Sequence, residues 1–191
     1  MAAPHISTEL DIAKQALRQR SLAARSGQDP VAAGHALALH LLASLPPPAN
    51  AVVSGFWPLG QEIDLRFLME TLHARGHAVV LPVTPKRGLP LTFRRWWPGQ
   101  AMEPERFGTF RPTGQEMTPG YLLIPLLAFD RSCNRLSYGA GYYDRTLAGL
   151  QGRFTVGCAF ANQQVDSVPV GPYDARLDAV VTENGVIRGE G

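Results

Sequence analysis

The sequence predicts a three-layer α/β domain in which helices flank a largely parallel β-sheet. Short apolar segments rich in β-branched residues alternate along the chain with segments whose apolar residues recur at helical spacing. Such alternation favours parallel strands joined by helices that cover both faces of the sheet. The 191 residues suit one domain and contain no internal repeat, low-complexity tract or domain-separating linker. We therefore expect residues 1–191 to form a single domain of Rossmann-like architecture.

Two helices are predicted at the N-terminus, as a helical pair. The first begins near the capping sequence Ser-Thr-Glu at residues 7–9 and continues to about Ser26. The second runs from about Pro30 to Ser44, and three consecutive prolines at residues 46–48 end it. Apolar residues at i, i+3 and i+7 of the first helix predict an inward-facing stripe, formed by Leu10, Ala13 and Leu17.

The remaining elements alternate between strands and helices. Helical spacing predicts helices at residues 62–75, which Gly76 ends, and at residues 142–150. The segment from Pro98 to Pro119 is rich in Pro and Gly and lacks periodicity, so it is expected to be a surface or site-forming loop. Predicted strands lie at residues 51–56, 77–83, 91–96, 121–127, 154–159 and 178–182. Ligands of such sheets bind at the carboxyl ends of the strands, so the residues that follow each strand are expected to form the site.

The composition is typical of a soluble globular protein, with 45% apolar and 18% charged residues. The formal net charge of +2 is too small to indicate nucleic-acid binding, and no long Lys/Arg block occurs. The two cysteines, Cys133 and Cys158, have no spacing typical of a zinc site or of a disulfide framework. The sequence has no signal-peptide core and no apolar run near the roughly 20 residues needed to cross a bilayer. We expect a cytoplasmic protein that binds neither nucleic acid nor membrane.

The segment from Arg135 to Leu147 is the most informative part of the chain. It places Gly139 and Gly141 in a turn between a buried strand and a helix. Glycine lets the backbone approach an anion closely, and the unpaired N–H groups of the following helix attract phosphate. Asp144 supplies a hard oxygen ligand, which indicates a bridging cation such as Mg²⁺. On these residues alone, a tight turn followed by a carboxylate that complements the helix dipole explains the pattern equally well.

Other common sites are not favoured by the sequence. The loop has no Gly-Lys-Ser/Thr sequence, and it lacks the third glycine and the downstream acid of a dinucleotide-binding fingerprint. A serine hydrolase is not indicated, because no Gly-x-Ser-x-Gly sequence occurs. His73 and His77 are spaced i, i+4, but Gly76 intervenes at the predicted helix end, so surface histidines are the better interpretation than a metal site.

Several segments, taken in order, resemble the 5-formyltetrahydrofolate cyclo-ligase (methenyltetrahydrofolate synthetase) family from end to end. They are Lys14–Arg18, Trp57–Asp64, Leu91–Trp96, Pro125–Leu147 with its Gly-x-Gly-Tyr-Tyr-Asp-Arg core, Val156–Phe160 and Asp174–Glu183. Each segment alone is weak evidence, whereas the whole set in this order is specific for the family. The resemblance implies a compact α/β fold and an ATP- and Mg²⁺-dependent conversion of 5-formyltetrahydrofolate to 5,10-methenyltetrahydrofolate, with release of ADP and phosphate. It also implies small-molecule substrates, with or without a polyglutamate tail on the folate, and a monomeric protein.

The resemblance implies roles for particular residues. Lys14, Arg18 and Tyr143 correspond to catalytic positions, and Asp144 and Asp178 to magnesium ligands. The implied ATP-binding residues are Lys14, Arg18, Arg135, Leu136, Ser137, Tyr138, Gly139, Ala140, Gly141, Tyr142 and Tyr143. The implied folate-binding residues are Trp57, Glu62, Trp96, Tyr138, Gly139, Ala140, Gly141 and Tyr142.

Local chemistry offers an alternative for each of these groups. Lys14 and Arg18 share a helix face with Arg25, which suits a polyphosphate, although without the resemblance solvated helix charges would be the better interpretation. Glu62 can accept paired N–H donors of a pterin ring or be an exposed residue in the first turn of a helix. Asp178 alone is typical of a strand-end or turn carboxylate, and buried packing explains the tryptophans equally well.

The chain departs from the family pattern in the glycine loop. Ser137 stands where the family usually has glycine, so serine is strained there if that position has a positive φ. Tyr138 stands where some members carry arginine, which would move a phosphate or substrate contact to Arg135, Arg145 or Lys86. These departures leave open an alternative function, a non-catalytic nucleotide- or folate-binding protein of the same fold.

Overall fold

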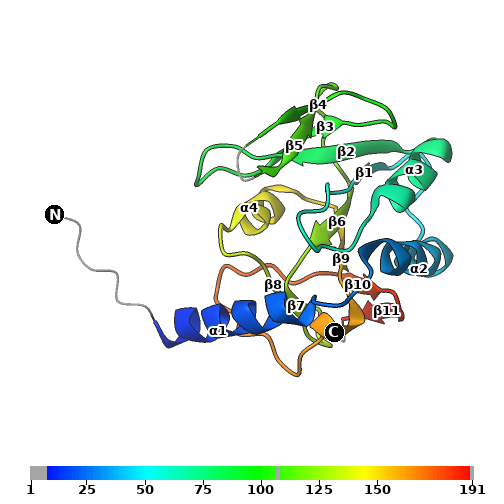
Figure 1. Cartoon of the computed structure of the whole chain (residues 1–191). Helices are drawn as coiled ribbons and strands as arrows, with labels where there is room; N and C mark the ends of the chain where they lie inside the picture. The colour runs from blue at the N-terminus through cyan, green and yellow to red at the C-terminus, as the bar shows by residue number, and fades with distance from the viewer. Residues whose placement is uncertain (1–7, 106–107, 190–191) are drawn as a thin grey trace.

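The computed structural model describes residues 8–105 and 108–189. At its centre lies a seven-stranded sheet with the strand order β11-β10-β9-β6-β1-β2-β3 (Figure 1). The inner strands are parallel to one another, and the edge strands β3 and β11 are antiparallel to their neighbours. The strands are β1 (Val52–Ser54), β2 (Ala78–Val83), β3 (Thr92–Arg95), β6 (Tyr121–Pro125), β9 (Phe154–Cys158), β10 (Ala179–Thr182) and β11 (Gly185–Arg188). The predicted largely parallel sheet is confirmed.

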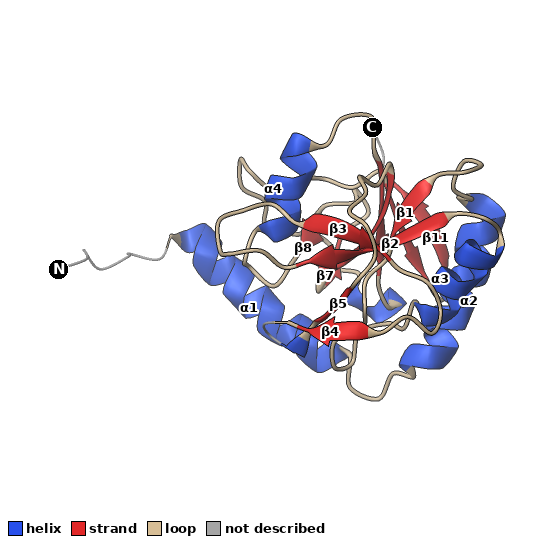
Figure 2. Ribbon diagram, turned by 90° about the horizontal axis from the view of Figure 1, so that it is seen from above, coloured by secondary structure: helices blue, strands red, loops and turns tan. Residues whose placement is uncertain are grey.

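Helices cover both faces of this sheet (Figures 1 and 2). Helices α2 (Pro30–Ser44) and α3 (Arg66–Ala74) lie on one face, where α2 packs against α3, β10 and β11. Helix α4 (Tyr142–Gly149) lies on the other face. No helix within the described ranges combines the length and the apolar character that crossing a membrane needs.

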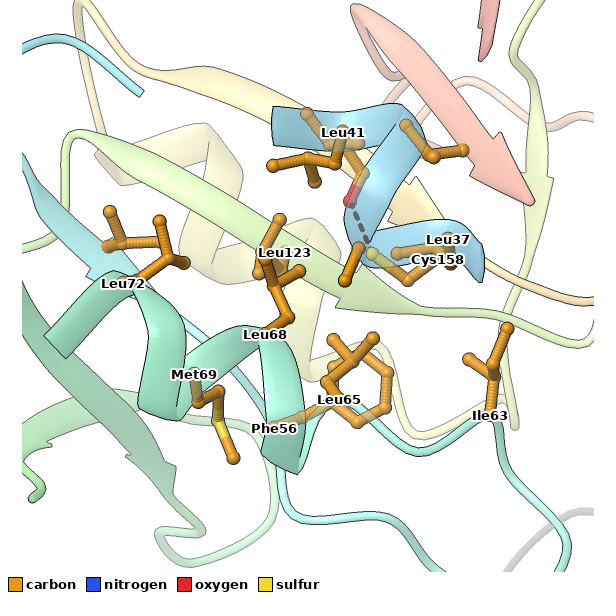
Figure 3. Packing of buried hydrophobic residues seen from close by; sticks show 14 of the residues in the cluster. Leu37, Leu41, Phe56, Ile63, Leu65, Leu68, Met69, Leu72, Leu123 and Cys158 are labelled. Atoms are coloured by element: carbon orange, nitrogen blue, oxygen red, sulfur yellow. Dashed lines mark hydrogen bonds between the residues drawn. The ribbon is translucent and has the colours of Figure 1, made fainter. Parts of the chain in front are cut away.

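The side chains of the central strand β6 alternate between two hydrophobic cores, as expected for a strand that is buried on both faces. Leu123 belongs to the core formed with α2 and α3, in the cluster that includes Leu41 and Leu68 (Figure 3). Leu122 and the following Ile124 belong to the second core, on the side of α4. The core therefore continues through the sheet, and β6 is fixed from both sides.

Capping residues define where the N-terminal helices begin. Helix α1 (Glu9–Ala24) starts at Thr8, whose hydroxyl accepts the N–H of Asp11 while the Asp11 carboxylate accepts the N–H of Thr8. Helix α2 starts at Asp29, whose carboxylate accepts two N–H groups of the first turn, and has proline at its first position. The predicted boundaries agree with both helices to within two residues.

The two predicted N-terminal helices are both present, and their main contacts are with different parts of the molecule (Figure 2). Helix α1 lies against β7 and a short 3₁₀ turn at Ala161–Gln163. The predicted inward stripe is wrong in part, since Ala13 is exposed and Leu10 is only half-buried. Leu17 is buried, and the face that turns inward continues along polar residues, Ser21 and Arg25. The polar face of α1 is therefore the one that meets the protein.

Three further differences concern the segments between the predicted elements. Helix α3 begins only at Arg66, because the Asp64 carboxylate accepts the backbone N–H of Arg66, so residues 57–65 form a loop. The Pro/Gly-rich segment contains a small hairpin, β4 (Met102–Pro104) and β5 (Phe110–Pro112). A second ribbon, β7 (Ala128–Phe129) with β8 (Arg135–Leu136), connects β6 to the glycine loop. Strands this short carry too few residues for a periodicity signal.

Close packing of α2 against the loop that precedes α3 predicts a large loss of stability from one added methyl group. A Cβ at Gly34 would lie 1.9 Å from the carbonyl oxygen of Asp64. We expect Gly34→Ala to lower the free energy of unfolding by about 2 kcal/mol, because overpacking outweighs the gain in helix propensity. Urea denaturation measures this. Gly149→Ala in α4, where a Cβ meets no atom within 4 Å, is the matched control, and equal stability of the two variants would contradict the packing.

Candidate active site

A cleft of about 460 Å³ opens at the carboxyl ends of strands β1, β2 and β6. Its walls are mainly apolar, and the loops that follow these strands supply most of them. Residues lining the cleft are Phe56, Trp57, Leu59, Glu62, Leu81, Pro82, Thr84, Leu91, Thr109, Phe110, Pro125, Ser137, Tyr138, Ala140, Gly141, Tyr142 and Tyr143. The site therefore lies where a parallel α/β sheet is expected to bind its ligand.

Glu62 is the acidic residue among those that line the cleft, and it is only 3% exposed. The interpretation as an exposed helical residue is therefore wrong, because Glu62 lies in the loop before α3. Its Oε1 accepts a hydrogen bond from the Tyr138 hydroxyl at 2.6 Å, and its Oε2 accepts one from the backbone N–H of Leu59 at 2.9 Å. Burial raises the pKa of the Glu62 carboxyl, and these two donors and the charge of Arg25 oppose that rise.

Tyr138 connects Glu62 to helix α1. Its hydroxyl accepts a hydrogen bond from Nη1 of Arg25 at 2.7 Å while donating to Glu62. Arg25 is 5% exposed, and its Nη2 donates to the carbonyl oxygen of Leu126 at 2.8 Å. The expectation that Arg25 extends a cationic surface for a polyphosphate is therefore wrong. Arg25 lies behind the cleft and bonds to one of its wall residues.

The glycine loop has the backbone geometry that the sequence pattern indicates. Gly139 and Gly141 have φ angles of +99° and +66°, which disfavour any residue with a side chain. Ser137 is not among the described residues with positive φ, so it is not strained in the way considered above. Its carbonyl oxygen accepts a hydrogen bond from Nε of Arg18 at 3.0 Å. Arg145 donates to the carbonyl oxygen of Ala140 at 2.8 Å, so two arginines hold the loop.

Helix α4 begins directly after this loop and has no side-chain cap at its N-terminus. The first-turn N–H groups are therefore available to an anion, and the positive end of the helix dipole lies there. Lys14 and Arg18 share one face of α1, as their i, i+4 spacing predicts, and both are half-buried. Lys14 forms an ion pair with Asp174. The loop, the start of α4 and Arg18 thus make up a candidate anion-binding region, and Lys14 lies one turn away from Arg18 on α1.

Arg135 and Asp144 form a buried ion pair behind the loop. The Arg135 side chain is 1% exposed and that of Asp144 is 18% exposed. The backbone N–H of Ala175 also donates to Asp144, at 3.2 Å. Burial lowers the pKa of Arg135, and the charge of Asp144 opposes that fall. Arg135 and Leu136 belong to β8 and are buried, whereas Ser137, Tyr138 and residues 140–143 line the cleft.

The two predicted magnesium ligands lie in different surroundings. Asp144 is in the first turn of α4, next to the anion-binding region. Asp178 precedes β10, at the amino end of that strand, where its Oδ2 accepts the N–H and the hydroxyl of Thr155, both at 2.7 Å. No group of three or more His, Cys, Asp or Glu side chains suited to a metal ion occurs among the described residues. One partly exposed carboxylate beside an anion site fits Mg²⁺ that is bound mainly by phosphate oxygens.

The aromatic residues of the site separate into lining and supporting positions. Trp57 lines the cleft, whereas Trp96 is buried and packs edge-on against Trp57 with their ring centroids 6.4 Å apart. The Tyr143 hydroxyl is buried without a hydrogen-bond partner among the described residues. The sequence interpretation missed Phe110 of the hairpin and the role of Arg25. Only the expectation of a site-forming loop pointed to the hairpin.

Comparison with known proteins gives a consistent result. The model of the 5-formyltetrahydrofolate cyclo-ligase family matches residues 11–183. The 5-formyltetrahydrofolate cyclo-ligase of Haemophilus influenzae is 36% identical over 125 residues, which cover 61% of this chain and 67% of the relative. The enzyme of the same name from Escherichia coli K12 is 32% identical over 178 residues, which cover 88% of this chain and 96% of the relative.

Solved structures are similar over nearly the whole chain. The NMR structure of Aquifex aeolicus 5,10-methenyltetrahydrofolate synthetase has a TM-score of 0.78 and 25% identity, and the match covers 93% of each chain. A 5,10-methenyltetrahydrofolate synthetase from Mycoplasma pneumoniae has a TM-score of 0.72 at 23% identity, covering 89% of this chain and 98% of that one. The α/β fold is thus common to all three chains.

The buried ion pair predicts that Asp144 matters for stability even without ligands. We expect Asp144→Asn to lower the free energy of unfolding by about 2 kcal/mol, because the buried Arg135 keeps its charge but loses its carboxylate partner. Urea denaturation of the ligand-free protein tests this. Asp166→Asn, at an exposed position, is the control. Equal stability of the two variants would contradict the ion pair.

Proposed function

The chain belongs to the 5-formyltetrahydrofolate cyclo-ligase family and is an enzyme, and we propose that it converts 5-formyltetrahydrofolate to 5,10-methenyltetrahydrofolate with ATP and Mg²⁺. The observation that carries this proposal is the cleft in which the buried carboxylate of Glu62 faces the glycine loop. An apolar cleft with a few polar groups suits a flat heterocycle, and an anion-binding loop beside it suits a triphosphate.

The folate occupies the apolar part of the cleft in this proposal. Glu62 accepts the paired N–H donors of the pterin ring, because each carboxylate oxygen can accept more than one hydrogen bond. Trp57 and Phe110 supply flat walls for the ring. Trp96 acts by holding Trp57 in place, since it is buried behind that residue.

ATP lies along the glycine loop, with its phosphates at the start of α4. The N–H groups of the first turn and the side chains of Lys14 and Arg18 neutralise phosphate charge. Asp144 is the residue that would hold Mg²⁺ together with phosphate oxygens, and the ion would supply further charge neutralisation on the transferred phosphoryl group. The family pattern also implies Asp178 as a ligand of this ion. We favour Asp144, because the Asp178 carboxylate is already bonded to Thr155 at the amino end of β10.

The reaction proceeds in two steps. The formyl oxygen attacks the γ-phosphorus of ATP, the bond from that phosphorus to the β,γ-bridging oxygen breaks, and ADP leaves. N10 of the folate then attacks the formyl carbon of the resulting imino-phosphate and closes the ring. N10 loses its proton, the carbon–oxygen bond breaks, and phosphate leaves. No bond to the protein forms at any stage.

Catalysis therefore rests on alignment of the two substrates and on charge neutralisation. In this proposal the folate in the cleft lies against the ATP on the glycine loop, so that the formyl oxygen is close to the γ-phosphate. Tyr143 lines the cleft, and its buried hydroxyl, which has no partner among the described residues, is suited to donate a hydrogen bond to an oxygen of the reacting groups. Such a donor acts without becoming covalently attached.

An absorbance assay tests the proposal directly. Methenyltetrahydrofolate absorbs distinctly from the formyl compound in the near ultraviolet, so purified protein, MgATP and 5-formyltetrahydrofolate should give a rising signal. Mixtures without ATP and without Mg²⁺ are the controls. A protein that binds both substrates and gives no signal would refute the proposed turnover.

Arg18 provides a sharper test of the ATP site. Arg18→Ala should raise the KM for ATP by about tenfold or more, because one charge-assisted contact is lost and the Ser137 carbonyl is released. The KM for the folate should change little. Arg20→Ala, an exposed position on the same helix, is the matched control. A folate KM that rises as much as the ATP KM would argue against this assignment.

A further inference from the structure

The hydrogen bonds around Glu62 have a fixed direction. Arginine can only donate hydrogen bonds, so the Tyr138 hydroxyl must accept from Arg25 and give its single proton to Glu62. The second carboxylate oxygen accepts the N–H of Leu59. Both oxygens of Glu62 therefore face donors, an arrangement that favours the ionised carboxylate.

Arg25 is the first donor in this series of hydrogen bonds, and a second contact fixes its guanidinium group. Its Nη2 donates to the carbonyl oxygen of Leu126, which also accepts the Nε2 amide of the buried Gln163 at 2.9 Å. Arg25 takes part in none of the ion pairs found among the described residues. Its charge is therefore matched most closely by Glu62, across the Tyr138 hydroxyl.

From this geometry we propose that Arg25 and Tyr138 are positioning residues that keep Glu62 ionised and oriented toward the folate. The inference rests on the proposed function only in assigning the folate to Glu62. Glu62 lies in the loop before α3, Tyr138 in the glycine loop and Arg25 at the end of α1, so three distant segments meet at one carboxylate.

The ionised state matters for recognition. A carboxylate accepts hydrogen bonds from the pterin N–H groups at roughly twice the strength of a neutral acceptor, whereas a protonated carboxyl presents a competing donor. The titratable side chains that face Glu62 are Arg25 from α1, Tyr138 from the loop and Tyr143 from α4. Burial already raises the pKa of Glu62, and removing a donor that opposes this rise raises the pKa further.

The test compares Tyr138→Phe, Arg25→Met and Arg25→Lys with the unaltered protein. Binding of 5-formyltetrahydrofolate is measured by calorimetry without ATP from pH 6 to pH 8.5, so that no turnover occurs. Loss of a donor raises the pKa of Glu62, so affinity should be lost at the acid end. We expect Tyr138→Phe and Arg25→Met to bind folate about tenfold more weakly at pH 6, with little change at pH 8.5. In a plot of affinity against pH, the fall on the acid side should move up by about one pH unit.

Controls separate this effect from damage to the fold. Arg25→Lys keeps a cation and a donor and should restore part of the affinity at pH 6. Tyr173→Phe and Arg20→Met make comparable changes at exposed positions and should leave the pH profile unaltered. Weakening by the same factor at every pH would overturn the inference, because a merely structural role would act in that way.

A second measurement does not depend on folate binding. Infrared spectra of the ligand-free protein follow the carboxylate band of Glu62, identified as the band that is missing in Glu62→Gln. The band should disappear at a higher pH in Tyr138→Phe than in the unaltered protein, and identical titrations would overturn the inference. If the unaltered protein binds no folate while the band shifts as expected, the proposed function fails and the positioning role stands.

Discussion

The buried central strand β6 is the constraint on which the rest of the structure depends. Its side chains enter both hydrophobic cores, so neither its register nor its direction can change without disrupting packing on both faces. The chain leaves β6 at the carboxyl edge of the sheet and continues through β7 and β8 into the glycine loop. The position of that loop is therefore set by the sheet and not by the loop itself.

Hydrogen bonds of polar side chains fix the positions of the loops around the cleft. The buried Asp130 carboxylate accepts the N–H groups of Ser132, Asn134 and Val168, which fixes the turn between β7 and β8. Helix α1 then closes this region with its polar face, through Arg18 on the loop backbone and Arg25 at the end of β6. Such contacts are specific in direction, whereas apolar packing is not, which suits a site whose backbone groups bind ligand.

Sequence reasoning predicted the sheet, the helices that cover it and the glycine loop, because periodicity and glycine placement are local signals. It could not predict the burial of Glu62, since the extra loop before α3 is created by Asp64 accepting the N–H of Arg66. The inward face of α1 was also misjudged, because Arg25 is buried through partners more than 100 residues away in the chain. Pairing across such separations leaves no periodic signal.

The place of Tyr138 has a thermodynamic consequence. The same residue belongs to the loop assigned to the nucleotide and bonds the carboxylate assigned to the folate. Any displacement of Tyr138 by one ligand changes the binding free energy of the other, and linkage requires the effect to be equal in both directions. The coupling between the two substrates would then pass through one phenol group.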